Sequence, residues 1–207
     1  MIDAIIPTIP GREASLERLL DSLQRTTVSA YDTVIVRDSP TCGEGWKAGL
    51  ERSQSPYVAF LCDDQEFTGK GWDGICIETV DNGGIPCPRV WFPDGRPESF
   101  GGDMHALHHT SRIPKKDGTR VDYTPIPFLS REMAEEIGVL ETQYAGDVWV
   151  SYRGRQLGYD TILRHGFEVR HWHEQIGRGA GMTQNERDAM DCETLWKELE
   201  KCGKMMA

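Results

Sequence analysis

Apolar and amphipathic stretches alternate along the first 84 residues of the chain. Three short apolar runs have the length of buried strands, and each is followed by residues that favour a turn. Between and after them, apolar residues recur at helical spacing. The predicted order is strand 3–9, helix 13–26, strand 32–40, helix 43–54, strand 57–61 and helix 71–84. Strands separated by helices predict a parallel sheet with right-handed crossovers, as in a Rossmann-like α/β fold.

The pattern changes after this first half. Residues 85–128 contain short β-like pieces and many turn residues, which predict hairpins and a long loop that shape one wall of a pocket. Helical patterns then return. The remaining predicted elements are helix 130–138, helix 144–159, strand 168–173 and a polar, capped helix over 183–202. We expect one domain, because no stretch of the chain has the composition of a linker.

Composition and charge restrict the classes of function. With 38% hydrophobic and 27% charged residues, the chain is typical of a folded protein. It has no apolar run of roughly 18 residues and no signal-peptide pattern, so we expect no membrane span and a cytoplasmic location. Six scattered cysteines without a CxxC pair favour reduced thiols over a zinc site or a disulfide framework. The net charge of −10 disfavours general nucleic-acid binding, although basic residues cluster between Arg112 and Arg120.

Polar residues follow each of the three predicted strands of the first half. In open α/β sheets, ligands bind at the carboxyl ends of the strands. The residues at these ends are Thr8, Pro10 and Arg12 after the first strand, Asp38 and Ser39 after the second, and Asp63 and Asp64 after the third. We therefore expect a ligand site at this edge of the sheet.

Asp63 and Asp64 directly follow an apolar run, where unpaired carboxylates are costly to bury. Adjacent carboxylates repel unless a cation neutralises them, and Mg²⁺ or Mn²⁺ would leave coordination positions open for a substrate phosphate. The pair therefore predicts a divalent metal that bridges a diphosphate. The alternative is a helix cap in a solvated turn, which also favours Asp.

Several segments resemble one known family. YVAFLCDDQEFTGKGW (57–72) resembles the metal-binding segment of family 2-like glycosyltransferases with the GT-A fold, in which a strand ends in a D-x-D-type motif. DAIIPTIPGREASLERLLDSL and TVIVRDSP resemble that family's first strand, first helix and second strand. PFLSREMAEEIG, QYAGDVWVSYRGRQLGY and VRHWHEQIGRGAG resemble its acceptor-side helices and closing strand. The resemblance covers about residues 2 to 181.

The resemblance implies a GT-A fold of the nucleotide-diphospho-sugar transferase superfamily, with a mainly parallel central sheet flanked by helices. Its nucleotide-binding half would span 1–84, its acceptor and catalytic half 85–182, and a C-terminal helix 183–207. It further implies a metal-dependent, inverting, hexosyltransferase-type enzyme that uses a UDP-sugar and Mn²⁺ or Mg²⁺. The implied site residues are Asp147 as catalytic base; Thr8, Pro10, Arg12, Asp38, Lys47, Asp63 and Arg178 at the nucleotide; and Asp64, His171 and His173 at the metal.

The two histidines alternate along a predicted strand and therefore point to opposite faces. The resemblance implies that one of them ligates the metal or contacts the diphosphate, and we favour His171 over His173. The Gly-rich turn 177–181, with Arg178, is suited to wrapping phosphate through backbone N–H groups. A structural histidine bonded to a backbone carbonyl is the alternative for either position.

The chain departs from the family's pattern at several positions. Cys62 stands where the first Asp or Asn of the metal motif is usual, and Arg37 replaces the first acid of the pair after the second strand. Gly146 replaces the usual Glu before Asp147, and Trp46 stands where Arg is common. These departures leave the metal dependence and the donor nucleotide open.

Two other functions fit the same pattern. A nucleotidyltransferase shares the Rossmann-like core and a carboxylate-bound Mg²⁺, but it would need acids for two metals. A non-catalytic nucleotide-sugar-binding module would keep the fold without turnover. The acceptor is a saccharide, a small metabolite, a protein or a modified nucleic-acid base, and the sequence does not choose among them.

Overall fold

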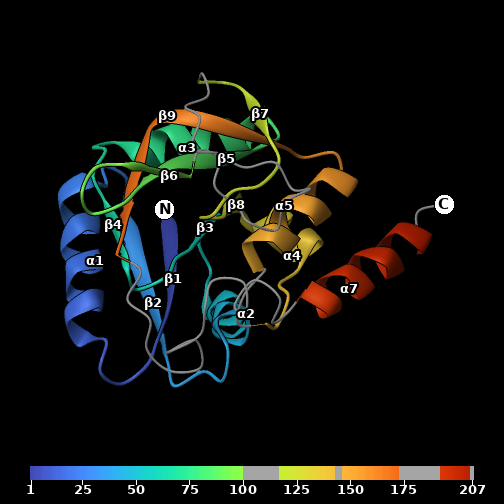
Figure 1. Cartoon of the computed structure of the whole chain (residues 1–207), viewed down its shortest axis with the longest axis horizontal. Coiled ribbons are helices and arrows are strands. Elements are labelled where there is room, and N and C mark those ends of the chain that lie inside the picture. The colour runs from blue at the N-terminus through green and yellow to red at the C-terminus, as the bar shows by residue number, and fades with distance from the viewer. Residues whose placement is uncertain (100–116, 143–145, 173–191, 206–207) are drawn as a thin grey trace.

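The structure is a computed structural model, and it describes residues 1–99, 117–142, 146–172 and 192–205. Helices and strands alternate at the start of the chain, whereas later several strands or helices follow one another directly (Figure 1). The strands are β1 (Ile2–Thr8), β2 (Tyr31–Arg37), β3 (Tyr57–Phe60), β4 (Gln65–Phe67), β5 (Gly84–Trp91), β6 (Pro97–Ser99), β7 (Arg120–Val121), β8 (Phe128–Ser130) and β9 (Asp160–His171). The helices are α1 (Glu13–Thr26), α2 (Cys42–Arg52), α3 (Trp72–Asp81), α4 (Arg131–Ile137), α5 (Gly146–Gln156) and α7 (Cys192–Met205). Every element predicted for the first half is present.

The first sheet has the order β2-β1-β3-β8. Strand β1 runs parallel to β2 and β3, whereas β8 is antiparallel to β3. Nearly all of β1 is buried, as expected for a central strand covered on both faces. Thr8 pairs with Arg37 at the end of β2, and Ile5 pairs with Phe60 at the end of β3. The carboxyl ends of the three parallel strands therefore meet at one edge.

The second sheet has the order β4-β9-β5-β6, with β7 also paired to β9. The sequence predicts a hairpin in the region of β5 and β6 and the end of β9, but it does not predict that these strands form one sheet. Strands β5 and β9 are parallel, and the other pairs in this sheet are antiparallel. The α/β class is confirmed. However, the structure has two mixed sheets where one mainly parallel sheet was expected.

Strand β5 lies where the sequence predicts hairpins and a loop. Its register against β9 shifts between Cys87 and Arg89, so the irregularity falls at Pro88, which has no N–H to give to a ladder. Strand β9 passes the same point with Gly166 at φ +90°, a conformation that favours glycine. These interruptions hide two long strands from a search for regular alternation, and only the end of β9 was predicted.

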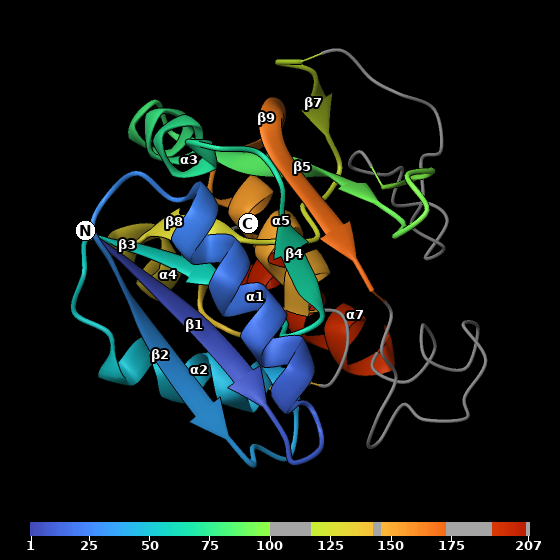
Figure 2. The same ribbon diagram turned by 90° about the vertical axis from the view of Figure 1, so that its left-hand side faces the viewer.

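Helices α1 and α2 lie on opposite sides of the first sheet (Figure 2). Helix α1 packs against β4, and α2 packs against β1 and β2. Leu16, Leu19 and Leu23 of α1 are buried at the spacing of one helical face. The predicted C-terminal helix is present as α7, which packs against α5, although its expected start at 183 lies outside the described residues. No helix in the described part of the chain is long and apolar enough to cross a membrane.

An aromatic cluster joins the two sheets. Trp72 of α3 is fully buried, and its ring lies 4.4 Å from that of Phe67 in β4, 5.9 Å from Phe128 in β8 and 5.6 Å from Phe167 in β9. Aromatic side chains bury large apolar areas and prefer such offset or edge contacts. The cluster therefore fixes β4 and β9 relative to β8 of the first sheet.

Candidate functional site

Asp63 and Asp64 lie in the short turn between β3 and β4. The Gln65 backbone N–H donates to the Cys62 carbonyl at 3.3 Å, and the Gln65 side-chain oxygen accepts from the Cys62 N–H at 3.0 Å. Both Asp residues are buried, with 6% and 7% of their surfaces exposed. The turn therefore presents two adjacent carboxylates in an environment that demands positive charge.

Arg12, in the connection from β1 to α1, supplies that charge. Its Nη2 lies 2.6 Å from Asp63 Oδ1 and 3.3 Å from Asp64 Oδ2. The Thr8 hydroxyl donates to Asp63 Oδ2 at 2.7 Å. The sequence predicted a cation at this place, and the structure shows that the chain itself provides one.

His171 faces Asp64 from the second sheet. Its Nε2 lies 3.5 Å from Asp64 Oδ2, and its Nδ1 lies 3.0 Å from Oε1 of Glu98 in β6. Main-chain pairing sets this arrangement, because Gln65 pairs with His171 and the Trp172 N–H donates to the Asp64 carbonyl at 2.9 Å. The side chains form one polar network, which we call the acidic network: Thr8, Asp63, Arg12, Asp64, His171 and Glu98.

Charges within the acidic network shift the pKa values of its members. Burial alone would raise the pKa of Asp64, but His171 and Arg12 lower it to about 2. Burial alone would lower the pKa of His171, but Asp64 and Glu98 raise it to about 10. Burial raises the pKa of Asp63, and Thr8 and Arg12 oppose this only in part. At neutral pH, His171 is therefore an imidazolium between two carboxylates.

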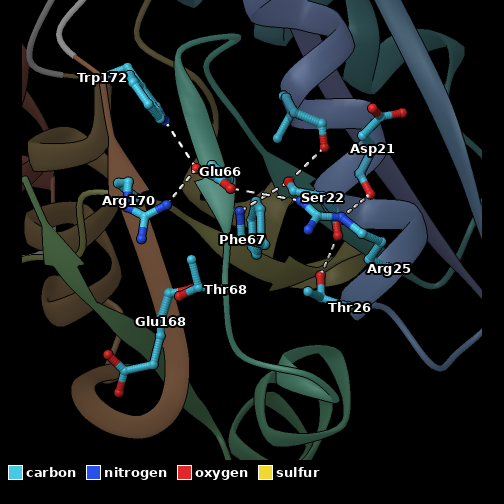
Figure 3. A network of polar contacts seen from close by, with 11 residues as sticks. Asp21, Ser22, Arg25, Thr26, Glu66, Phe67, Thr68, Glu168, Arg170 and Trp172 are labelled. Carbon is cyan, nitrogen blue, oxygen red and sulfur yellow. Dashed lines mark hydrogen bonds and ion pairs between the residues drawn. The ribbon is translucent and has the colours of Figure 1, made fainter. Parts of the chain in front are cut away.

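Glu66 anchors the strand pair that carries Asp64 and His171 (Figure 3). Its Oε2 accepts from Arg170 Nη1 at 3.0 Å and from the Trp172 indole N–H at 3.2 Å. Its Oε1 lies 3.7 Å from Nη2 of Arg25 in α1. The Phe67 N–H donates to the hydroxyl of Ser22, also in α1, at 3.0 Å. Strands β4 and β9 and helix α1 are thus bonded together beside the acidic network.

Cys62, which stands where the family motif usually has an acid, contacts another cysteine and not the acidic network. Its sulfur lies 3.9 Å from that of Cys42, the first residue of α2. The contact with Cys42 and burial together raise the pKa of Cys62 well above its usual value. Since thiols bind metals as thiolates, Cys62 is unsuited to be a ligand here.

Asp147 lies in the first turn of α5 and accepts the Val148 N–H at 2.8 Å. The preceding Gly146 packs closely on the ring of Trp46. A Cβ at this position would lie only 2.9 Å from Trp46 Cζ3, so the close packing requires glycine. The indole N–H of Trp46 donates to the carbonyl of Leu61, which precedes the acidic turn, at 3.0 Å. Trp46 therefore links the start of the helix that carries Asp147 to the end of β3.

The other predicted residues are placed as follows. Asp38 is exposed after β2, its φ is +60°, and its N–H donates to the Thr8 carbonyl at 3.1 Å. A left-handed backbone is uncommon for residues other than Gly, Asn and Asp, and it occurs often at functional sites. Pro10 is exposed, and Lys47 forms an exposed ion pair with Glu141.

The structure thus brings together Thr8, Arg12, Asp63, Asp64 and His171, with Asp38 beside Thr8. His173, Arg178 and most of the basic cluster from Arg112 to Arg120 lie outside the described residues. Sequence reasoning did not find Glu98, which lies in a turn-rich segment with no pattern that points to a buried role.

A divalent metal is implied by the family resemblance, and the donor atoms can be tested against it. Within the described ranges, no group of three or more His, Cys, Asp and Glu side chains is arranged to hold a metal. Asp64 Oδ2 and His171 Nε2, 3.5 Å apart, offer one oxygen and one nitrogen, which suit Mn²⁺. Mg²⁺ commonly takes one or two carboxylates and completes its shell with substrate phosphates and water. These residues therefore fit a metal that is bound jointly with a diphosphate.

We expect the stability of the metal-free protein to depend on pH from two sides. The folded-state pKa of Asp64, about 2, is below its ordinary 3.8. The ionised Asp64 therefore adds to the free energy of unfolding above pH 3.8, and this stabilisation is lost as the pH falls through 2. The folded-state pKa of His171, about 10, is above its ordinary 6.5, so its contribution is present below pH 6.5 and is lost as the pH rises through 10. Urea unfolding across this range measures both losses. His171→Gln should reduce the loss of stability between pH 6.5 and 10. The same loss in the variant and the wild type would contradict the assignment.

Replacement of Arg12 should strongly destabilise the fold. Arg12→Met leaves two adjacent buried carboxylates without their guanidinium, and breaking a buried pair in this way costs about 3–5 kcal/mol. Arg25→Met is the matched control, because the Arg25 side chain is 64% exposed and lies 3.7 Å from its partner, so its loss should stay within about 1 kcal/mol. Urea unfolding of both variants at neutral pH measures the difference, and equal losses would refute the central role of Arg12.

No protein-family model and no curated protein sequence matches the chain. Solved structures match it in fold. One is S. aureus TarS 1-349 in complex with UDP-GlcNAc, with a TM-score of 0.67 and 13% identity over 94% of this chain and 65% of that chain. Another S. aureus TarS structure gives a TM-score of 0.61 and 13% identity over 83% of this chain and 36% of that chain. GalNAc-T7 with UDP, GalNAc and Mn²⁺ gives 0.65 and 12%, over 84% of this chain and 44% of that chain.

These matches bear on the fold. The chain spans between about a third and two thirds of the length of the matched structures. The matched proteins are glycosyltransferases with the GT-A fold. At 12–13% identity, the likeness establishes architecture and leaves membership of family 2 as an expectation from the sequence. The chain has the fold of GT-A glycosyltransferases.

Proposed function

We propose that the chain is a metal-dependent, inverting glycosyltransferase that moves a sugar from a nucleotide-diphosphate donor, a UDP-sugar, to an acceptor hydroxyl. The observation that carries this proposal is the acidic network, which lies at the carboxyl ends of β1 and β3 in a GT-A fold. This is where open α/β sheets bind their ligands. TarS was solved with UDP-GlcNAc and GalNAc-T7 with UDP and Mn²⁺, which supports UDP as the nucleotide and Mn²⁺ as the metal.

In the proposed site, Asp64 and His171 would hold the metal. When bound, the ion supplies positive charge to the diphosphate that leaves. Imidazole binds metals in its neutral form, so His171 would have to be neutral to serve as a ligand. Thr8, Pro10, Asp38, Lys47 and Arg178 are proposed to contact the nucleotide. Arg12 and Asp63 are proposed to contact the nucleotide as well, and the Arg12 guanidinium also bridges the carboxylates of Asp63 and Asp64.

Asp147 is the proposed base. Inversion requires that the acceptor oxygen attacks the anomeric carbon while the bond from that carbon to the diphosphate oxygen breaks. The hydroxyl proton passes to the Asp147 carboxylate as the new glycosidic bond forms. The link through Trp46 supports this role, because it holds the first turn of α5 to the strand end that carries Asp63 and Asp64.

Asp63 is engaged by Thr8 and Arg12, which disfavours the two-metal site of a nucleotidyltransferase.

The proposed location is the cytoplasm, which agrees with the free thiols of Cys42, Cys62, Cys76, Cys87 and Cys202. The acceptor stays open among saccharides, metabolites, proteins and modified nucleic-acid bases.

The donor site is tested by calorimetric titration with UDP, with and without Mn²⁺. We expect the wild type to bind UDP more tightly with Mn²⁺ and Asp64→Asn to lose that gain, because it removes a charged ligand of the metal. Asp32→Ala, an exposed position at the start of β2, serves as the control and should bind as the wild type does. If the wild type binds UDP equally with and without Mn²⁺, the metal dependence is wrong.

The base is tested by following UDP release from UDP-GlcNAc or UDP-GalNAc, with water or added sugars as acceptors. Asp147→Asn should keep UDP affinity and lower turnover by about 10²–10⁴-fold, the usual contribution of a positioned base. Unchanged turnover in this variant would remove Asp147 from the mechanism. Donor binding without turnover in the wild type would indicate a binding module, and release of pyrophosphate from a nucleoside triphosphate would indicate a nucleotidyltransferase.

A further inference from the structure

We propose that Glu98 is a positioning residue, which holds the imidazole of His171 through Nδ1 so that Nε2 faces Asp64. The inference rests on the proposed function, in which Asp64 and His171 hold the metal. It assigns a role in the metal site to β6, which lies in the segment for which the sequence predicts hairpins and a pocket wall.

The burial of Glu98 is the first observation. Only 7% of its surface is exposed, and its Oε1 lies 3.0 Å from His171 Nδ1. A carboxylate in such surroundings is costly unless a donor or a cation compensates for the lost hydration. The imidazole of His171 lies between the two carboxylates, with Nδ1 3.0 Å from Glu98 Oε1 and Nε2 3.5 Å from Asp64 Oδ2. Glu98 is therefore a buried carboxylate in direct contact with a proposed metal ligand.

Main-chain pairing fixes the position of Glu98. Strand β6 pairs with β5 through Trp91 and Pro97, and Trp91 also pairs with Arg170 of β9, the residue before His171. The turn between β5 and β6 is closed by a bond from the Phe92 N–H to the Arg96 carbonyl at 2.9 Å. Glu98 therefore reaches His171 from a hairpin tied to the same strand, and its place does not depend on a long loop.

The chemistry of metal-bound histidine explains why such a carboxylate is useful. An imidazole that donates from Nδ1 to a carboxylate presents the Nε2 lone pair to the metal, in a fixed orientation and with increased basicity. Without the carboxylate, the ring loses its contact at Nδ1, and Nε2 is held less firmly toward Asp64 Oδ2. Removal of such a partner typically lowers metal affinity by about 10–100-fold.

Metal affinity provides the first test. Mn²⁺ binding in the presence of UDP would be measured by electron paramagnetic resonance for the wild type, Glu98→Gln and Glu98→Ala. We expect about 10–100-fold weaker binding in Glu98→Ala and a smaller loss in Glu98→Gln, whose amide oxygen still accepts from Nδ1. Glu168→Gln is the matched control: Glu168 accepts from the Trp91 indole at 2.6 Å in the same sheet, and its variant should bind Mn²⁺ as the wild type does. Wild-type affinity in both Glu98 variants would overturn the proposal.

The orientation of the ring provides a second test that needs no metal. In the metal-free protein, the imidazole Nδ1–H resonance of His171, assigned by its absence in His171→Gln, should exchange slowly with water. The resonance should weaken in Glu98→Gln and vanish in Glu98→Ala. An unchanged resonance in Glu98→Ala would overturn the proposal. If the wild type bound neither UDP nor Mn²⁺, the proposed function would fail, and this resonance would still decide whether Glu98 positions His171.

Discussion

Two neighbouring carboxylates lie buried at the end of β3, and they can do so because a cation lies on each side of them. Arg12 approaches from the connection to α1, and His171 approaches from β9. Each cation belongs to a different layer of the fold, so neutralising Asp63 and Asp64 requires that the layers meet at this point. The aromatic cluster around Trp72 and the bonds of Glu66 hold them there. The geometry of the site is therefore a consequence of how the two sheets pack.

The sequence predicts the part of the fold that depends on local pattern. Strands β1 to β3 and helices α1 to α3 have regular apolar spacing. Thr8, Arg12, Asp63 and Asp64, which follow two of these strands, meet as expected. Strands β4, β5 and β9 depend on pairing between distant segments. In addition, Pro88 interrupts the alternation of β5, and Gly166 interrupts that of β9. The spacing of apolar residues reports only local structure, so it does not reveal which distant segments pair.

The same division applies to the site. Asp63, Asp64 and Thr8 follow from their places at strand ends, and His171 followed from the family resemblance. Glu98 is 73 positions from its partner His171, and nothing in the turn-rich segment around it indicates a buried acid. For Arg12 the position was predicted but the partner was not, because the cation expected beside the carboxylates was a metal. The sequence also gives no reason to connect Trp46 with Gly146, two departures from the family pattern. In the structure, the Trp46 ring fills the space beside Gly146 that a side chain at this position would need.

The pairing of Arg12 with Asp63 and Asp64 affects how folding depends on metal supply. Sites that gather carboxylates without a resident positive charge often need their ion before the chain can fold, so metal supply then governs the amount of folded protein. Here the guanidinium of Arg12 already compensates the carboxylates. The chain can therefore reach its folded state before it meets any ion. Under the proposed function, cellular metal levels would then govern how much of the folded protein is active, and a chelator would stop turnover without unfolding the protein.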